Sequence, residues 1–313
     1  MVGSKYFAAI GGLTLPDKAR QNRGYAMNEL EGNAMFRRMT FIAMVGALVA
    51  TASAQQIERV RRADGAETAL KVYVPARSGC TPLAVISPGA GGTENGYAYL
   101  AKGMQQDGWL AIVVGHAESG PGKLLSEVRQ SGLHEGLEDM VDDPALYRDR
   151  LMDIGAALDF AARQCKAPYR ALLGHSMGAI TAEIEAGARN KLGVQGEDRF
   201  DAYVMISASG PGSIFPEGAW SGIRKPVYVL SGTRDKALEG PPETRTKPYY
   251  GLPAGCKWLG VVEGATHMDF ARNGAFGDAG KLTVKTATAF LDGARNGNCA
   301  LPPTPRGMTL KSK

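Results

Sequence analysis

Four short polar segments carry residues whose types and spacing suit nucleophilic chemistry. The first is the pentapeptide GHSMG at residues 174–178, which has the form G-x-S-x-G and directly follows a short apolar run. A serine at a sharp strand-to-helix turn presents its hydroxyl away from the backbone, at the positive end of the helix. The flanking glycines leave room for that turn. We therefore predict that Ser176 is a nucleophile; the alternative is a plain structural turn.

A serine nucleophile needs a base within reach of its hydroxyl. The chain contains four histidines, which are His116, His134, His175 and His267. His267 lies on a loop after the last predicted strand, and the chain order serine, acid, histidine makes it the expected base. We interpret His134 and His175 as surface or core residues. His116 closes a predicted strand, from which it could line the pocket.

The acid that orients the histidine is expected on the same rim of the sheet as the serine. Asp235 comes just past the predicted strand at 226–231 and is our choice for this role. Glu239 is the fallback. The ordinary alternative for Asp235 is a solvated loop charge.

The fourth segment is the glycine-rich run SPGAGGT at residues 87–93, which follows an apolar run. Acyl transfer creates an oxyanion, and this charge needs backbone N–H donors that are already in place. We assign these donors to the amides of Ala90 and Met177, against the alternative of a flexible turn. A phosphate-binding role is not expected, because neither a P-loop nor a dinucleotide-binding glycine motif follows.

Alternating strands and helices must position these residues. A hairpin is predicted through Asp64-Gly65, and residues 117–143 lack clear periodicity, so they either border the active site or are mobile. Repeated strand–helix alternation predicts an α/β fold with a mostly parallel sheet covered by helices on both faces. The predicted strands are 57–62, 68–74, 82–87, 109–115, 170–174, 201–208, 226–231 and 257–263, and the predicted helices are 97–106, 147–164, 178–189 and 282–291.

The N-terminal segment has the layout of a secretory signal peptide. Residues 35–54 begin with a basic pair, continue with an apolar run and end in Ala-Ser-Ala. The alternative is a buried N-terminal helix. Because a signal peptide works only at an N-terminus, we expect Met35 to be the true start and residues 1–34 to be a mis-assigned extension. Residues 55–313 would then form a single domain. The apolar run is too short to span a bilayer, so no stable membrane anchor is expected after its removal.

Composition narrows the class of protein. The chain has 313 residues, of which 44% are hydrophobic and 21% charged, as in ordinary globular proteins. The net charge of +5 is modest, and no Lys/Arg cluster forms a basic patch, so nucleic-acid binding is not expected. Four cysteines are too few for a disulfide-built scaffold but allow two pairs.

These motifs resemble those of the α/β-hydrolases. The match is best to the dienelactone-hydrolase-like and bacterial cutinase-like (polyester hydrolase) branch, over most of residues 57–299, through S-P-G, GHSMG, SGTRD, KPYYGLP and EGATHMDF. The resemblance implies an α/β-hydrolase fold, with an eight-stranded sheet in the order 1-2-4-3-5-6-7-8 and no metal or organic cofactor. Its triad positions match Ser176, Asp235 and His267, and its oxyanion amides match Ala90 and Met177.

The chain departs from this branch in two places. Polyester-degrading relatives usually carry an aromatic residue after S-P-G and a tryptophan past the sixth strand, where this chain has Ala90 and the stretch 207–212. An aromatic clamp for a polymer ring is therefore in doubt. Trp220 could substitute, and a core or loop role for it is the alternative. Dienelactone hydrolase itself uses a cysteine nucleophile, whereas this chain has Ser176.

The resemblance also implies the disulfide pairing. In its strand order, Cys80 and Cys165 precede neighbouring parallel strands, at the same end of the sheet. Cutinase-like relatives often have a disulfide at the place of Cys256 and Cys299. We expect both pairs, which agree with an oxidising compartment and hence a secreted or periplasmic protein.

The resulting expectation is a secreted serine carboxylester hydrolase that works through an acyl-enzyme on small-molecule esters. Short acyl chains are expected, because no long lid insertion or lid domain is visible. One alternative is acyl transfer, or amide or lactone cleavage, by the same triad. Another is a non-catalytic binding module, since a fold does not determine function. The oligomeric state stays open.

Overall fold

The computed structural model describes residues 55–238, 240–271 and 278–313. The expected N-terminal extension, residues 1–34, and the expected signal peptide, residues 35–54, lie outside these ranges. So does the fallback acid, Glu239.

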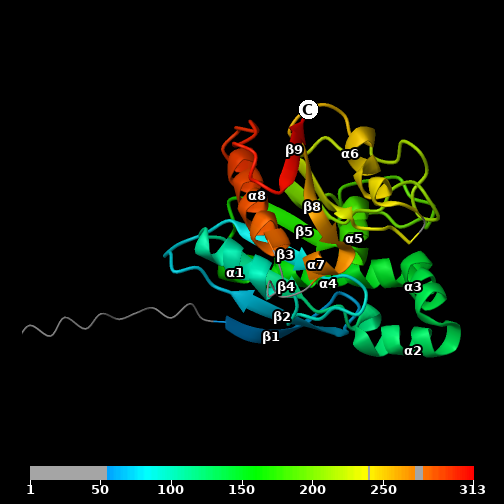
Figure 1. Cartoon of the computed structure of the whole chain (residues 1–313). Helices are drawn as coiled ribbons and strands as arrows, with labels where there is room; N and C mark the ends of the chain where they lie inside the picture. The colour runs from blue at the N-terminus through cyan, green and yellow to red at the C-terminus, as the bar shows by residue number, and fades with distance from the viewer. Residues whose placement is uncertain (1–54, 239, 272–277) are drawn as a thin grey trace, which may run out of the picture. The chain divides into compact units, whose positions relative to one another are not determined.

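Within these ranges the fold is α/β, built on one mixed and mostly parallel sheet (Figure 1). Its strand order is β1-β2-β4-β3-β5-β6-β7-β8-β9. The six strands from β4 to β8 in this order run parallel, whereas β1, β2 and β9 pair antiparallel at the two edges. The strands are β1 Gln55–Arg61, β2 Glu67–Tyr73, β3 Leu83–Ser87, β4 Leu110–Val114, β5 Arg170–His175, β6 Ala202–Ile206, β7 Val227–Arg234, β8 Lys257–Thr266 and β9 Met308–Ser312.

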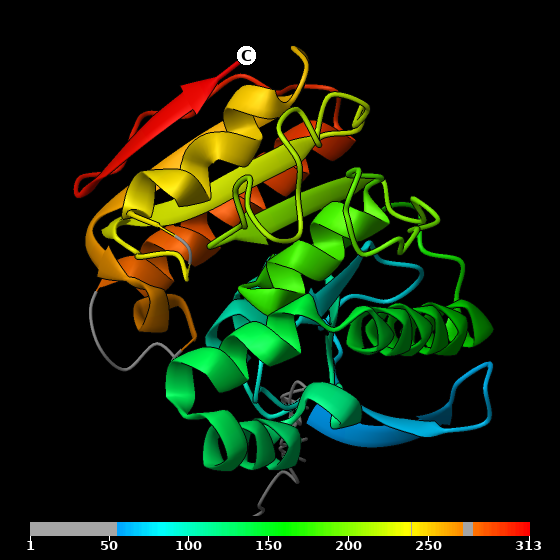
Figure 2. The ribbon, with the colours of Figure 1, turned by 90° about the vertical axis from the view of Figure 1, so that its right-hand side faces the viewer.

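Two layers of helices cover the sheet (Figures 1 and 2). One face packs against α1 and α8, and the other against α4 and α5, so each face has its own apolar core. The central strands β3 and β6 are buried along their whole length, which explains why their sequences are continuously apolar. The helices are α1 Ala98–Gln106, α2 Pro121–Ser131, α3 Leu133–Asp142, α4 Pro144–Gln164, α5 Met177–Glu185, α6 Lys247–Gly251, α7 His267–Ala271 and α8 Asp278–Arg295, with 3-10 turns η1 Ala117–Ser119 and η2 Pro242–Thr246.

The described part of the sheet has nine strands, one more than the eight expected. The additional strand is β9, which pairs with β8 and is the edge strand on that side of the sheet, where it is mostly exposed. The first eight strands follow the expected order. The segment 117–143, which lacked a recognisable pattern, contains the helices α2 and α3 (Figure 1).

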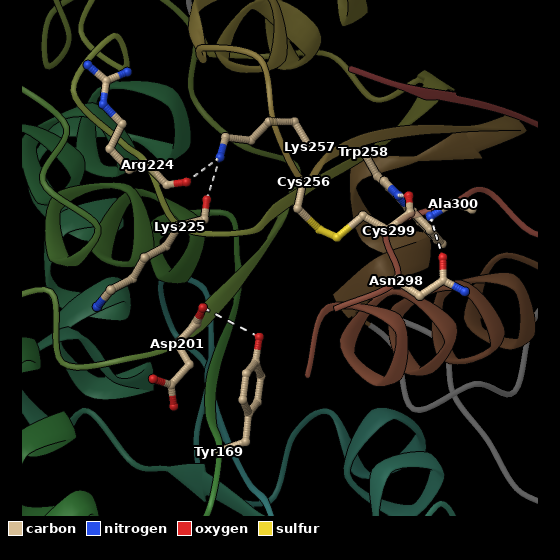
Figure 3. Close-up of a disulfide and its surroundings, with 10 residues drawn as sticks. All are labelled: Tyr169, Asp201, Arg224, Lys225, Cys256, Lys257, Trp258, Asn298, Cys299 and Ala300. Carbon is tan, nitrogen blue, oxygen red and sulfur yellow. Dashed lines mark hydrogen bonds between the residues drawn. A yellow bond between two sulfur atoms is a disulfide. The ribbon is translucent and has the colours of Figure 1, made fainter. Parts of the chain in front are cut away.

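Both expected disulfides are present, Cys80–Cys165 and Cys256–Cys299. Figure 3 shows the second of these joining the start of β8 to the chain that leaves α8. The indole nitrogen of Trp258 donates to the carbonyl of Cys299 over 2.8 Å, which adds a second link at this junction. Cys80, Cys165 and Cys256 all precede parallel strands, so the cross-links lie at the amino ends of those strands.

The disulfides are consistent with an oxidising compartment. Among the residues described, no helix is long and apolar enough to cross a membrane.

Candidate active site

Ser176 occupies a sharp turn between β5 and α5. Its backbone has φ 56° and ψ −123°, a conformation that few non-glycine residues adopt. The turn brings neighbouring backbones so close that a β-carbon at Gly174 would overlap the backbone of Gly178, and one at Gly178 would overlap Ser87. The spacing G-x-S-x-G thus reflects close backbone contacts on both sides of the serine.

His267 links Ser176 to Asp235. Its Nε2 lies 2.9 Å from Ser176 Oγ, and its Nδ1 lies 2.9 Å from Asp235 Oδ1. Asp235 is fully buried, and its second oxygen accepts a hydrogen bond from Ser231 Oγ over 3.0 Å. Burial alone would raise the pKa of Asp235, but the hydrogen bond to His267 and the charge of Arg245 outweigh it and lower that pKa. The acid therefore stays ionised where it faces the histidine.

The glycine-rich loop after β3 lies beside the serine. A β-carbon at Gly89 would be 3.2 Å from Ser176 Cβ, and Ala90 lines the same cavity as Ser176. Met177 is the first residue of α5, so its N–H has no carbonyl of a preceding helical turn as a partner. The amides of Ala90 and Met177 thus come from the two segments that flank the serine hydroxyl.

A buried arginine holds the glycine-rich loop in place through hydrogen bonds. Arg150 of α4 is 1% exposed, and its guanidinium donates to the carbonyl of Pro88 and to Ser87 Oγ, the latter over 3.0 Å. It also donates to Ser119 Oγ over 2.6 Å and to Thr181 Oγ1 over 2.9 Å. One side chain therefore joins the loop, the η1 turn and α5.

His116 belongs to this support and not to the cavity lining, contrary to its proposed pocket role. It is 2% exposed, its Nδ1 lies 2.8 Å from Asp153 Oδ2, and its Nε2 lies 3.0 Å from Ser87 Oγ. Burial, together with the charge of Arg150, lowers the pKa of His116 well below its usual range. The result is a second serine–histidine–aspartate chain, but Ser87 is completely buried, so substrate has no access to it.

His175 contacts His267 from inside the protein, in agreement with its interpretation as a core residue. Its Nε2 donates to the carbonyl of His267 over 3.2 Å, while its Nδ1 accepts from the Tyr97 hydroxyl over 2.7 Å. Tyr97 in turn accepts from the amide of Gly89 over 3.2 Å. A short chain of hydrogen bonds therefore connects His267 with the glycine-rich loop.

Ser176 opens into a cavity of about 470 Å³, within the usual range for small-molecule sites. Helices α2 and α3 form one wall of this cavity, and the chain after β6 forms another. Trp220 does not line it. Its ring is buried and donates from Nε1 to Glu183 Oε1 over 2.9 Å, which is the core role considered for it.

The tertiary structure adds Arg245, Arg150 and Tyr97 to the site, none of which the sequence pattern singled out. Arg245 is 5% exposed and donates to the carbonyl of Ser207 over 3.0 Å and to that of Lys236 over 3.1 Å. Its isolated position in TRTKP is typical of a surface residue, so the sequence contains no signal for this role. His134 is exposed on α3, as expected.

No protein-family model matches the chain, and no curated protein matches it. Among the described residues, no three His, Cys, Asp or Glu side chains are grouped so that they could hold a metal ion.

Proposed function

We propose that the protein is an α/β-hydrolase-type serine carboxylester hydrolase. The observation that carries this proposal is the continuous contact from Asp235 through His267 to Ser176, with both hydrogen-bonded distances at 2.9 Å. Serine, histidine and aspartate have the mutual geometry that acyl transfer by a triad requires, and their chain order is the one typical of α/β-hydrolases.

The roles follow from the chemistry of each group. With Asp235 holding the proton on Nδ1, His267 accepts the Ser176 proton at Nε2 as the serine oxygen attacks an ester carbonyl. The amides of Ala90 and Met177 bind the oxyanion, and His267 then donates its proton to the leaving alcohol. Water, activated by the same histidine, releases the acid from the acyl-enzyme. The His267 side chain is 27% exposed, so the water that this step requires can approach it.

We further infer export to an oxidising compartment. Two disulfides support this inference, because such bonds are rare in reducing compartments. The signal-peptide pattern in residues 35–54 supports it independently.

The test combines turnover with active-site labelling. Ser176→Ala should lower kcat on p-nitrophenyl butyrate by several powers of ten, about 10⁴-fold or more, and should abolish labelling by a fluorophosphonate probe. Ser221→Ala, at an exposed serine outside the cavity lining, is the control and should keep both. Full esterase activity in Ser176→Ala would refute the proposal, and so would a wild-type protein that neither turns over esters nor reacts with the probe.

A further inference from the structure

One wall of the cavity is an apolar stripe on α3. Leu133, Leu137 and Val141 are spaced four residues apart, so they share one face of the helix, and all three line the cavity that contains Ser176. The stripe covers eight residue steps, or about 12 Å along the helix axis.

Other apolar side chains complete a channel with this stripe. Leu124 of α2 packs over Gly91 of the glycine-rich loop, where a β-carbon would have no room. Ile180 of α5 and Ile214 after β6 line the same cavity. We call this set the apolar slot; it consists of Leu124, Leu133, Leu137, Val141, Ile180 and Ile214.

The far end of α3 is tied to the segment after β6. Ser213 Oγ donates to Asp142 Oδ1 over 2.6 Å, and the Tyr147 hydroxyl donates to the carbonyl of Val141 over 2.7 Å. These bonds hold α3 against its neighbours at the end of the stripe. Hydrogen bonds to neighbouring segments therefore hold this wall of the slot in place.

The position of the slot favours the acyl part of an ester. At the tetrahedral carbon, the oxyanion points to the Ala90 and Met177 amides, and the alcohol must lie at His267, which protonates it. His267 follows β8, whereas Leu124 adjoins the loop after β3, and these strands lie on opposite sides of β5 in the sheet. The remaining substituent, the acyl chain, is the one directed toward α3.

We propose that the apolar slot binds an unbranched acyl chain of medium length, longer than the short chains expected from the absence of a lid insertion, so that the substrate class is medium-chain carboxylic esters; this inference rests on the proposed function. An extended alkyl chain advances roughly 1.3 Å per carbon, and a stripe of about 12 Å therefore matches roughly eight to ten carbons. Each CH₂ that enters the slot is expected to raise kcat/KM by up to about fourfold until the slot is full.

The experiment varies the two halves of the ester separately. One series holds p-nitrophenol constant and extends the acyl chain from acetyl to dodecanoyl; the other holds butyrate constant and extends the alcohol. Leu137→Trp should lower kcat/KM for the octanoyl ester at least tenfold relative to the acetyl ester. The dependence of kcat/KM on alcohol length in the second series should stay unchanged. Leu137→Ala, which widens the slot, should shift the optimum to longer chains. Leu125→Trp is the control, because Leu125 is 51% exposed on α2 and does not line the cavity.

Fluorophosphonate labelling of Ser176 separates this inference from the proposed function. An unlabelled wild-type protein would refute the proposed function itself. A labelled wild-type protein with a flat acyl-length profile would overturn the slot alone. A Leu137→Trp loss confined to the alcohol series would also overturn it. A labelled protein in which Leu137→Trp shortens and Leu137→Ala lengthens the preferred acyl chain supports it.

Discussion

Arg245 lies against the acid of the candidate triad, with its Nε 3.5 Å from Asp235 Oδ1. Its Nη2 is also 3.4 Å from His267 Nδ1, the atom that contacts Asp235 at 2.9 Å. A guanidinium only donates hydrogen bonds and a carboxylate only accepts them. His267 Nδ1 can therefore either accept from Arg245 or donate to Asp235, but not both at once. The shorter contact selects the tautomer that donates to Asp235, which leaves Nε2 free to accept the Ser176 proton.

The charge of Arg245 should extend activity toward acidic pH. Its charge lowers the pKa of Asp235, and a protonated Asp235 would no longer accept the hydrogen bond that keeps the proton on His267 Nδ1. Arg245→Gln should therefore move the acid limb of kcat/KM to higher pH. The measurement is kcat/KM on a p-nitrophenyl ester between pH 4.5 and 9. The other ionisable groups around the relay whose pKa the charge of Arg245 lowers are Asp235, His175 and Glu183.

Two further variants separate charge from structure. Arg245→Lys keeps a cation and should leave the acid limb within a few tenths of a pH unit of the wild type. Arg199→Gln removes another largely buried arginine, which pairs with Glu185 far from the triad, and should cost stability without moving the limb. An unmoved or downward-shifted limb in Arg245→Gln would contradict the prediction.

Arg150 should control the oxyanion loop. Its planar guanidinium donates to four groups at once, and a lysine ammonium has neither the shape nor enough protons to replace it. Arg150→Lys should lower kcat by roughly 10–100-fold with little change in KM, because a displaced oxyanion amide weakens the transition state most. A boronic acid that mimics the tetrahedral intermediate should lose affinity in parallel. If KM instead rose by the same factor by which kcat fell, and boronate binding stayed unchanged, Arg150 would have only a structural role.

Glu183 should make the protein less stable as the pH rises. Burial raises the pKa of this carboxyl from its ordinary 4.5 to about 8, although it accepts from the Ser209 amide and the Trp220 indole. Between about pH 4.5 and pH 8, the folded state therefore holds a proton on Glu183 that the unfolded chain has released. The stability that this proton contributes is fully present below about pH 4.5 and is lost as the pH rises to about 8. Glu183→Gln removes the titration and keeps an acceptor. Urea unfolding at pH 5 and pH 8.5 should show a decrease in wild-type stability that is smaller in Glu183→Gln, by on the order of 1–3 kcal/mol; an equal decrease in both would contradict this.

The two disulfides should stabilise the fold without affecting turnover. They close separations of 85 and 43 residues, for which the chain-entropy model predicts about 4 kcal/mol each. They lie at the amino ends of the strands, whereas Ser176, Asp235 and His267 follow the carboxyl ends. Cys256→Ser/Cys299→Ser should thus unfold at lower urea concentration and keep the wild-type kcat at 25 °C. A large loss of kcat in a folded double variant would show that the cross-link positions the site.

Some elements were predictable because their patterns are local. The strand before GHSMG is a continuous apolar run that matches β5, and the glycine spacing around Ser176 follows from contacts within one turn. The carboxyl ends of parallel strands meet at one rim, so the positions of Asp235 and His267 after strands placed them near the serine.

Other elements could not be predicted from the sequence, because their sequence patterns are weak or also occur in other structures. β9 is mostly exposed, with two lysines near its end, so it has no apolar run to mark it. The apolar stripe on α3 is present in the sequence, but Gly132 and Gly136 interrupt the helical pattern there. Its relation to Ser176 appears only when α3 folds over the cavity.

The sequence by itself determined the α/β class and the three residues that meet at the candidate relay, since apolar periodicity and the G-x-S-x-G turn are short-range properties. The order of the first eight strands followed from the family resemblance and not from periodicity. Only the tertiary structure decided what surrounds that relay. Arg245, Arg150 and the apolar slot come from segments far apart in the chain, and whether a charge is buried, or an apolar side chain faces a cavity, depends on which distant residues pack against it.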